Sequence, residues 1–180
     1  MKTCEKFRKI KLLLSDVDGV MNDGRIYYLP TPEGVKVAKF FNVRDGLGVR
    51  LLQRAGLDFG IITGRKDKVV ETRCRDLGCR FSALGVKDKA RKVLEILQEA
   101  KLSKEEVAYI GDDWNDLPVF DIVGLSLVPQ DAPQEIKERV DFVIPVNGGE
   151  GVIRYAVEKI LKCKGLFEKA VEEFLASLKG

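Results

Sequence analysis

The sequence predicts a three-layer α/β fold in which helices cover both faces of one parallel sheet. Two observations carry this prediction. Short apolar runs alternate with stretches of helical period along nearly the whole chain, which is typical of a parallel sheet with crossover helices. The chain has 180 residues, enough to bury a sizeable core but too few for a second full domain. We therefore expect one domain over residues 1–180.

Six apolar runs are predicted to be strands, at residues 11–15, 57–63, 79–82, 106–110, 125–128 and 142–144. Amphipathic stretches between them are predicted to be helices, at residues 48–55, 66–77, 88–100, 115–122 and 151–161. This order indicates a Rossmann-like sheet, and such sheets bind ligands outside the carboxyl ends of their strands. A further amphipathic helix is expected at about residues 165–178.

One segment interrupts the alternation. Residues 24–42 hold two runs rich in aromatic and β-branched side chains around the turn Pro-Thr-Pro-Glu-Gly at 30–34. This pattern predicts a β-hairpin inserted after the first strand. The pattern alone leaves two interpretations equally open: the hairpin lies on its own domain, or its exposed edges pair with other subunits.

Composition narrows the possible functions. The 31 basic and 28 acidic residues nearly balance, so we expect neither nucleic-acid nor membrane partners. The chain has no histidine, which excludes Ser-His-Asp and Cys-His catalysis. With no signal peptide and no long apolar run, we expect a cytoplasmic protein with four reduced, buried cysteines. The charged fraction of 33% hints at a hot-growing source.

Polar residues follow the predicted strands where each strand ends. They are Asp16 and Asp18 after the first run, Thr63, Gly64 and Arg65 after the second, and Asp112, Asp113 and Asp116 after the fourth, with Lys89 at the start of a helix. Parallel strands bring these positions to one edge of the sheet. Five carboxylates in so small a volume require a cation, and hard oxygen ligands together with phosphate suit Mg²⁺.

These residue types predict metal-assisted phosphoryl transfer through an aspartyl-phosphate. Asp16 is able to attack phosphorus, and Asp18 is able to protonate the leaving oxygen and then activate water. Thr63, the backbone of Gly64 and the ammonium of Lys89 would hold the phosphoryl group. Asp-x-Asp and Thr-Gly-Arg are weak signals alone and Gly-Asp-Asp-x-x-Asp is moderately specific, but all four segments in this order argue against a purely structural explanation.

Four segments resemble the haloacid dehalogenase superfamily of phosphatases over about residues 12–161. They read DVDGVM at 16–21, FNVRDG at 41–46, IITGR at 61–65 and GDD at 111–113. FNVRDG is the most specific of them. It is similar to a segment of the phosphatases that release 3-deoxy-D-manno-octulosonate (KDO) from its 8-phosphate in lipopolysaccharide sugar biosynthesis.

The resemblance implies a role for each residue. It makes Asp16 the nucleophile and an Mg²⁺ ligand, Asp18 the acid/base with its carbonyl on the metal, and Asp112 the third ligand. Asp113 and Asp116 would support the metal, and Thr63 and Lys89 would hold the phosphate. The implied substrate contacts are Asp18, Asn42, Val43, Arg44, Asp45, Gly46, Arg50, Gly64, Arg65, Arg73 and Lys89.

The resemblance also implies the assembly: no large cap domain, and a homotetramer built by the hairpin. One departure keeps the substrate open. Glu150 stands where the octulosonate enzymes often have arginine, and a related phosphatase of a nine-carbon sugar-acid 9-phosphate can carry that glutamate. That relative tends to lack the arginine kept here as Arg65. A remote alternative, a receiver-type signalling domain, places its acidic pair first and its phosphorylated aspartate later.

Overall fold

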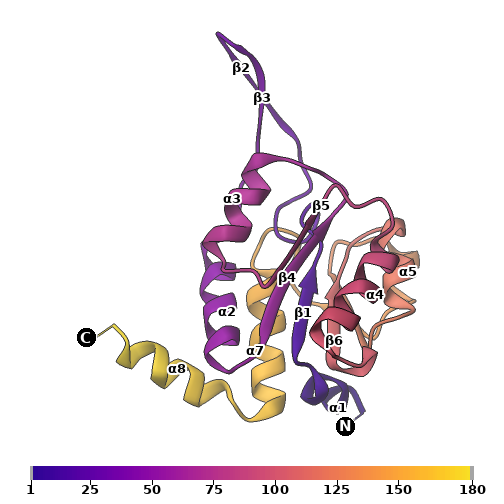
Figure 1. Cartoon of the computed structure of the whole chain (residues 1–180), viewed down its shortest axis with the longest axis vertical. Coiled ribbons are helices and arrows are strands. Elements are labelled where there is room, and N and C mark those ends of the chain that lie inside the picture. Colours follow the sequence, from indigo (N-terminus) through magenta and orange to yellow (C-terminus); the bar gives the residue numbers. More distant parts are fainter. Residues whose placement is uncertain (1, 179–180) are drawn as a thin grey trace.

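The computed structural model describes residues 2–178 and places a six-stranded parallel sheet at the centre of the molecule (Figure 1). The strand order is β5-β4-β1-β6-β7-β8. The strands are β1 (Leu12–Ser15), β4 (Asp58–Thr63), β5 (Phe81–Leu84), β6 (Val107–Ile110), β7 (Leu125–Pro129) and β8 (Phe142–Ile144). The predicted fold class is confirmed, and residues 2–178 form no large cap domain.

Strand β1 lies in the middle of the sheet and pairs in parallel with β4 and β6 on either side. All four of its residues are buried, because helices cover both faces of the sheet. Ser15 pairs with Ile61 and with Ile110, so the segments that follow these three strands leave the sheet at the same edge.

Two groups of helices cover the sheet (Figure 1). One face packs in a single core against α1 (Lys2–Lys9), α2 (Val43–Arg54), α3 (Lys68–Asp76), α7 (Val152–Lys164) and α8 (Phe167–Ala176). The other packs against α4 (Lys89–Ala100), α5 (Leu117–Phe120) and α6 (Gln134–Lys137). Short 3₁₀ turns, η1 (Lys104–Glu106) and η2 (Trp114–Asp116), precede β6 and α5.

The predicted hairpin is present as β2 (Tyr27–Thr31) and β3 (Gly34–Ala38), a separate two-stranded sheet. It projects from the body of the molecule above α3 (Figure 1). Large apolar side chains on it are exposed: Tyr28, Leu29, Val35, Val37 and, just beyond, Phe40. The interpretation in which the hairpin lies on its own domain is therefore wrong.

Several boundaries differ from the predicted ones. Helix α2 begins five residues early, at Val43, because the Asn42 side chain accepts a hydrogen bond from the Arg44 N–H and caps it. The third strand lies at Phe81–Leu84, later than the predicted 79–82. Helix α1 was not predicted at all. It is anchored by Phe7, which is fully buried in the core.

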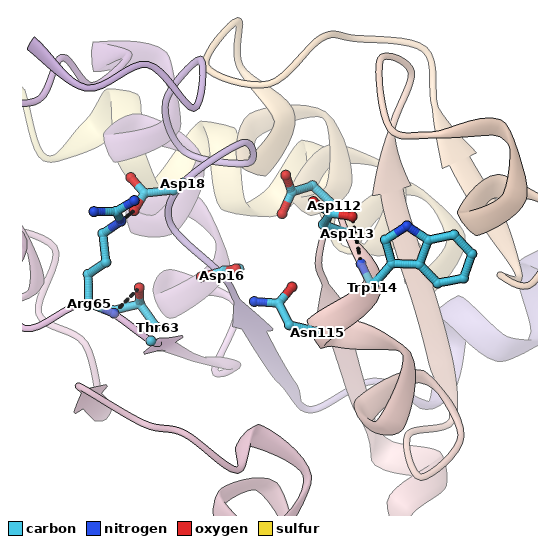
Figure 2. A pocket seen from close by; sticks show the side chains of 9 residues that line it. Asp16, Asp18, Thr63, Arg65, Asp112, Asp113, Trp114 and Asn115 are labelled. Atoms are coloured by element: carbon cyan, nitrogen blue, oxygen red, sulfur yellow. Dashed lines mark hydrogen bonds and ion pairs between the residues drawn. The ribbon is translucent and has the colours of Figure 1, made fainter.

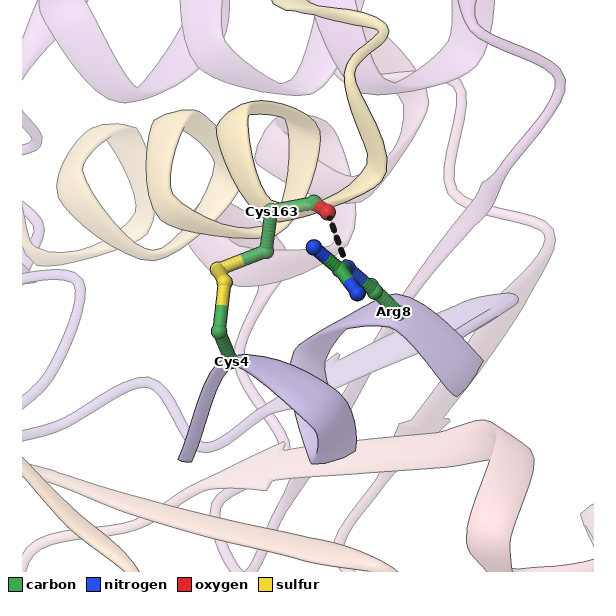
Figure 3. Close-up of a disulfide and its surroundings, with 3 residues drawn as sticks. All are labelled: Cys4, Arg8 and Cys163. Carbon is green, nitrogen blue, oxygen red and sulfur yellow. Dashed lines mark hydrogen bonds between the residues drawn. A yellow bond between two sulfur atoms is a disulfide. The ribbon is translucent and has the colours of Figure 1, made fainter. Parts of the chain in front are cut away.

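The prediction of four reduced cysteines is wrong for two of them. Cys4 of α1 and Cys163 of α7 form a disulfide with a Cα–Cα distance of 5.5 Å (Figure 3). Arg8 Nε also donates to the Cys163 carbonyl at 2.9 Å. Cys74 and Cys79 are free thiols. Within residues 2–178, the helices are too short or too polar to cross a membrane.

Candidate active site

A cavity of about 420 Å³ opens at the carboxyl edge of the sheet, where β1, β4 and β6 end (Figure 2). It is lined by Asp16, Asp18, Thr63, Gly64, Arg65, Asp112, Asp113, Trp114 and Asn115. The structure therefore brings together the polar residues predicted after the first, second and fourth apolar runs. Trp114 is the only tryptophan in the chain and is 54% exposed.

A buried charge cluster lies at the base of this cavity. Lys89 opens α4, and its Nζ lies 2.5 Å from Asp16 Oδ2 and 2.7 Å from Asp116 Oδ1. Tyr109 donates its hydroxyl to the same Asp116 oxygen at 2.6 Å. The backbone N–H of Asp112 donates to the other Asp116 oxygen at 2.9 Å. Asp116 is thus fully hydrogen-bonded, and it fixes Lys89 beside the predicted nucleophile.

The carboxylates are more crowded than one lysine can neutralise. Burial raises the pKa of Asp16 to about 6, although Lys89 favours its charged form. Burial, with Asp116, Asp16 and Asp113 nearby, raises the pKa of Asp112 to about 8. Lys89 alone therefore does not offset the burial and crowding of these carboxyl groups. Oxygen atoms of Asp16, Asp112 and Asp116 lie within 4.8 Å of one another, so the donor set fits a hard divalent ion.

Gly19 allows Asp112 to approach the loop after β1. A Cβ atom at position 19 would lie 1.9 Å from Asp112 Oδ2, and the residue has φ +79°, which other residues rarely adopt. Any side chain here would displace Asp112. This contact explains why glycine follows the Asp-x-Asp pair.

Asp18, two residues after Asp16, accepts hydrogen bonds from Asn22 and Lys39 and forms an ion pair with Arg65. Arg65 Nε lies 3.0 Å from its Oδ2, and Asn22 Nδ2 lies 2.8 Å from its Oδ1. Lys39 Nζ lies 2.8 Å from Oδ1 and 2.9 Å from Oδ2. Asp18 therefore faces the cavity with both oxygens bound.

Known proteins share both this fold and this sequence. A family model described as haloacid dehalogenase-like hydrolase matches residues 81–155. A 3-deoxy-D-manno-octulosonate 8-phosphate phosphatase of Haemophilus influenzae is 36% identical over 178 residues, covering 97% of each chain. The chain belongs to the haloacid dehalogenase-like hydrolases. The family result also makes it an enzyme, a phosphoric monoester hydrolase, and so contradicts the receiver-domain alternative.

Two solved structures of the family are similar over most of their length. The phosphatase of Moraxella catarrhalis, in complex with magnesium, phosphate and KDO, has a TM-score of 0.90 at 32% identity, covering 96% of this chain and 98% of that one. The cobalt-bound phosphatase of Haemophilus influenzae has a TM-score of 0.84 at 36% identity, with coverages of 90% and 93%. Both carry a metal, magnesium in one and cobalt in the other, and the carboxylate cluster of this chain would require a cation.

The other predicted substrate contacts lie outside the cavity in the single chain. Val43 is 82% exposed, and Arg44 and Arg50 point to solvent on α2. Arg73 is held by the Asn42 carbonyl at 3.2 Å and stacks on the ring of Phe41. Asn42 itself lines a second hollow of about 560 Å³, which Glu150 also lines. Gly46 is half-buried against Arg73 and Leu77.

Asp45, predicted as a substrate contact, does not line the cavity in this structure. Its side chain is buried and accepts a hydrogen bond from the Arg154 backbone N–H at 2.9 Å. Helix α7 begins after Gly151, which offers no capping side chain, so Asp45 on α2 caps α7 instead. The acidic residue of FNVRDG therefore joins two helices.

We predict that Asp45 makes stability fall with rising pH. Burial raises its pKa to about 6, although the Arg154 N–H and the Arg73 guanidinium favour the charged form, and Asp45 Oδ2 has no partner among the described residues. The folded protein then holds the proton more tightly than the unfolded chain does. Asp45 therefore contributes to the free energy of unfolding below about pH 4, and this contribution is lost as the pH rises through 6. The loss is on the order of 3 kcal/mol.

The measurement compares the free energy of unfolding of Asp45→Asn and of the parent from pH 4 to pH 8. Asparagine keeps the oxygen that accepts from the Arg154 N–H but cannot ionise. The free energy of unfolding of the variant should therefore rise relative to that of the parent as the pH rises. Asp76→Asn, on the exposed end of α3, is the matched control and should track the parent. A constant difference between Asp45→Asn and the parent would contradict the prediction.

Sequence reasoning missed three residues around the site: Asn22, Lys39 and Tyr109. Tyr109 is fully buried one residue before the end of β6, and a polar tip in an otherwise apolar strand could have indicated it. Asn22 is a candidate turn residue near the Asp-x-Asp pair. Nothing in the alternating pattern of the hairpin marks Lys39.

Proposed function

We propose that this enzyme hydrolyses 3-deoxy-D-manno-octulosonate 8-phosphate to KDO and phosphate, in lipopolysaccharide sugar biosynthesis. The observation that carries the proposal is the cavity that joins Asp16, Asp18, Thr63, Arg65 and Asp112, in a chain resembling the KDO 8-phosphate phosphatases over nearly its whole length. Arg65 lies at the mouth, 55% exposed, where a guanidinium fork can bind the carboxylate of a sugar acid.

In the proposed mechanism the Asp16 carboxylate attacks phosphorus, and Asp18 protonates the leaving sugar oxygen. Asp18 then takes a proton from the water that hydrolyses the aspartyl-phosphate. Thr63, the Gly64 N–H and Lys89 hold the phosphoryl oxygens, with Lys89 already 2.5 Å from Asp16.

Asp16, the Asp18 carbonyl and Asp112 would hold Mg²⁺, with Asp113 and Asp116 in support. When bound, the ion offsets the negative charge of the phosphoryl oxygens and of the carboxylates. The raised pKa of Asp112 and the Mg²⁺ in the Moraxella catarrhalis structure support this assignment.

A second candidate substrate is the 9-phosphate of a nine-carbon sugar acid. Glu150 favours it, because this exposed acidic side chain lines the hollow beside Asn42 where the octulosonate enzymes often carry arginine. Arg65 favours the eight-carbon substrate. Glu150 and Arg65 therefore indicate different substrates.

The deciding experiment compares kcat/KM for the two sugar-acid phosphates and for a neutral sugar phosphate. We expect the kcat/KM of the eight-carbon acid to exceed that of the neutral sugar phosphate by at least about tenfold. An arginine that pairs with a carboxylate makes a charge-assisted contact that the neutral sugar lacks. A preference for the nine-carbon acid would overturn the first assignment. Equal rates on the neutral sugar would contradict carboxylate recognition by Arg65.

We also propose a homotetramer built by the hairpin. The exposed side chains of Tyr28, Val35 and Phe40 support it, since each is about two-thirds exposed on an element that projects from the body. We propose the cytoplasm as its location. A disulfide there is typical of proteins from hyperthermophiles, and the high charged fraction agrees with that source.

A further inference from the structure

A buried lysine lies at the base of the hairpin. Lys39 follows β3 directly, and only 2% of its side chain is exposed. Its ammonium lies between two carboxylates, 2.8 Å from Asp18 Oδ1 and 3.0 Å from Asp67 Oδ2. A buried ammonium requires compensating partners, and these two carboxylates supply them.

The donors around Asp18 differ in their freedom. Arg65 is 55% exposed and can turn toward a ligand, whereas Lys39 is enclosed. Asn22 is also enclosed, at 2% exposed, but it belongs to the same loop as Asp18 and moves with it. Lys39 is thus the one enclosed donor among the three that reaches Asp18 from another element.

Asp67 suggests a competing explanation for this lysine. Its Oδ1 accepts from the Val70 N–H at 2.8 Å and caps α3, while its Oδ2 faces Lys39. Lys39 could then serve only to fasten α3 to the hairpin. The two explanations differ in which carboxylate matters, Asp18 or Asp67.

We propose that Lys39 is a positioning residue that holds the Asp18 carboxyl where proton transfer takes place. The proposal rests on the proposed phosphatase function. As an Asp16 oxygen bonds to phosphorus, the bond from phosphorus to the leaving oxygen breaks and the Asp18 proton moves to that oxygen. Water then attacks phosphorus, the bond to Asp16 breaks, and the water proton returns to Asp18.

This assignment joins the hairpin to catalysis. Lys39 is the first residue after β3, so the register of the hairpin determines where its ammonium lies. A shift of the hairpin would move Asp18 relative to the substrate. Misplacement of a catalytic group by about 1 Å is able to lower a rate roughly a hundredfold.

The test uses two variants. Lys39→Met keeps a long, unbranched side chain but removes its charge, and Lys39→Arg restores a cation. The matched control is Lys36→Met, because Lys36 lies on β3, is 61% exposed and, among the described residues, has an ion pair only with the exposed Glu33. Each variant is assayed for kcat/KM on the sugar-acid phosphate and on p-nitrophenyl phosphate. The nitrophenolate leaves without a proton, so its release does not need Asp18 as an acid.

We expect Lys39→Met to lower kcat/KM for the sugar phosphate roughly 10- to 100-fold, and for the aryl phosphate less than about fivefold. Lys39→Arg should recover part of the difference, and Lys36→Met should match the parent on both esters. If Lys39 had only a structural role, Lys39→Met would lower kcat/KM by the same factor for both esters.

Asp67→Asn separates the competing explanation, since asparagine still caps α3 but no longer attracts Lys39. We expect it to stay within about threefold of the parent on both esters, and a loss like that of Lys39→Met would overturn the proposal. Melting and sedimentation of every variant monitor the fold and the assembly.

If Lys39→Met does not fold, the ratio of kcat/KM for the sugar phosphate to kcat/KM for the aryl phosphate is measured on Lys39→Arg and Lys39→Gln. A ratio equal to that of the parent in both variants would overturn the proposal. A parent that hydrolyses neither ester would contradict the proposed function. A parent that cleaves only the aryl ester or another alkyl phosphate would contradict the proposed substrate, and the ratio is then taken on the best alkyl phosphate.

Discussion

Asp16→Asn should abolish phosphate release while leaving the protein folded. Asp16 is 5% exposed and lies at the end of the central strand, where its Oδ2 is 2.5 Å from Lys89. An amide has nearly the same shape but is a far weaker nucleophile, so we expect a loss of at least about a thousandfold in kcat. Colorimetric phosphate release measures it.

Stability should change little in this variant. Burial already raises the pKa of Asp16 to about 6, so its charge is held at a cost at neutral pH, and asparagine removes that cost. Lys89 keeps Asp116 as a partner at 2.7 Å. A melting temperature close to that of the parent, together with lost activity, is the expected pair of results.

Two controls accompany the variant. Asp58→Asn makes the same chemical change at the opposite end of the sheet, where β4 begins and Asp58 pairs with Arg80, and it should remain active. Parent protein treated with EDTA should also be inactive and should recover with Mg²⁺. An active Asp16→Asn variant would contradict the nucleophile assignment, and full activity without a divalent ion would contradict the metal site.

Removing the disulfide should have the largest effect on stability. The Cys4–Cys163 bond closes a loop spanning 159 residues, nearly the whole chain. In the chain-entropy model, a loop of that length contributes about 5 kcal/mol by restricting the unfolded state. For a protein of this size, Cys4→Ser should lower the melting temperature by roughly 10 to 20 °C.

The matched control is Cys79→Ser, because Cys79 is a free, half-buried thiol. It should melt close to the parent, and a reducing agent should lower the parent to the level of Cys4→Ser. Thiol labelling of the denatured, unreduced protein should modify two cysteines. Four modified cysteines would show that the bond is absent, and equal melting of both variants would contradict the stabilising role.

The alternation of the sequence predicted the sheet well, because its strands are apolar runs that end in turn-forming or acidic residues. All six lie near their predicted positions. Helix α1 was not predicted because five of its eight residues, Lys2 to Lys9, are charged. It is held by Phe7 and by a disulfide to a residue 159 positions away. Contacts that distant leave no local pattern.

The same distinction applies to the site. Asp16, Thr63 and Asp112 could be grouped from the sequence because parallel strands end at one edge. Asp45 and Lys39 could not be interpreted in this way. The first caps a helix that begins more than 100 residues later, and the second reaches Asp18 from across the base of the hairpin. Pairing between distant elements, rather than local spacing, decides what each of them does.

The bond between Cys4 and Cys163 makes the molecule nearly a covalent ring, with the hairpin at a point far from the closure. A protease that cuts the exposed turn between Thr31 and Gly34 would therefore open the ring without separating its pieces. The nicked protein would run as one species on a non-reducing gel and as two fragments after reduction. It would also remain able to keep its central sheet, since both pieces stay tethered through α1 and α7.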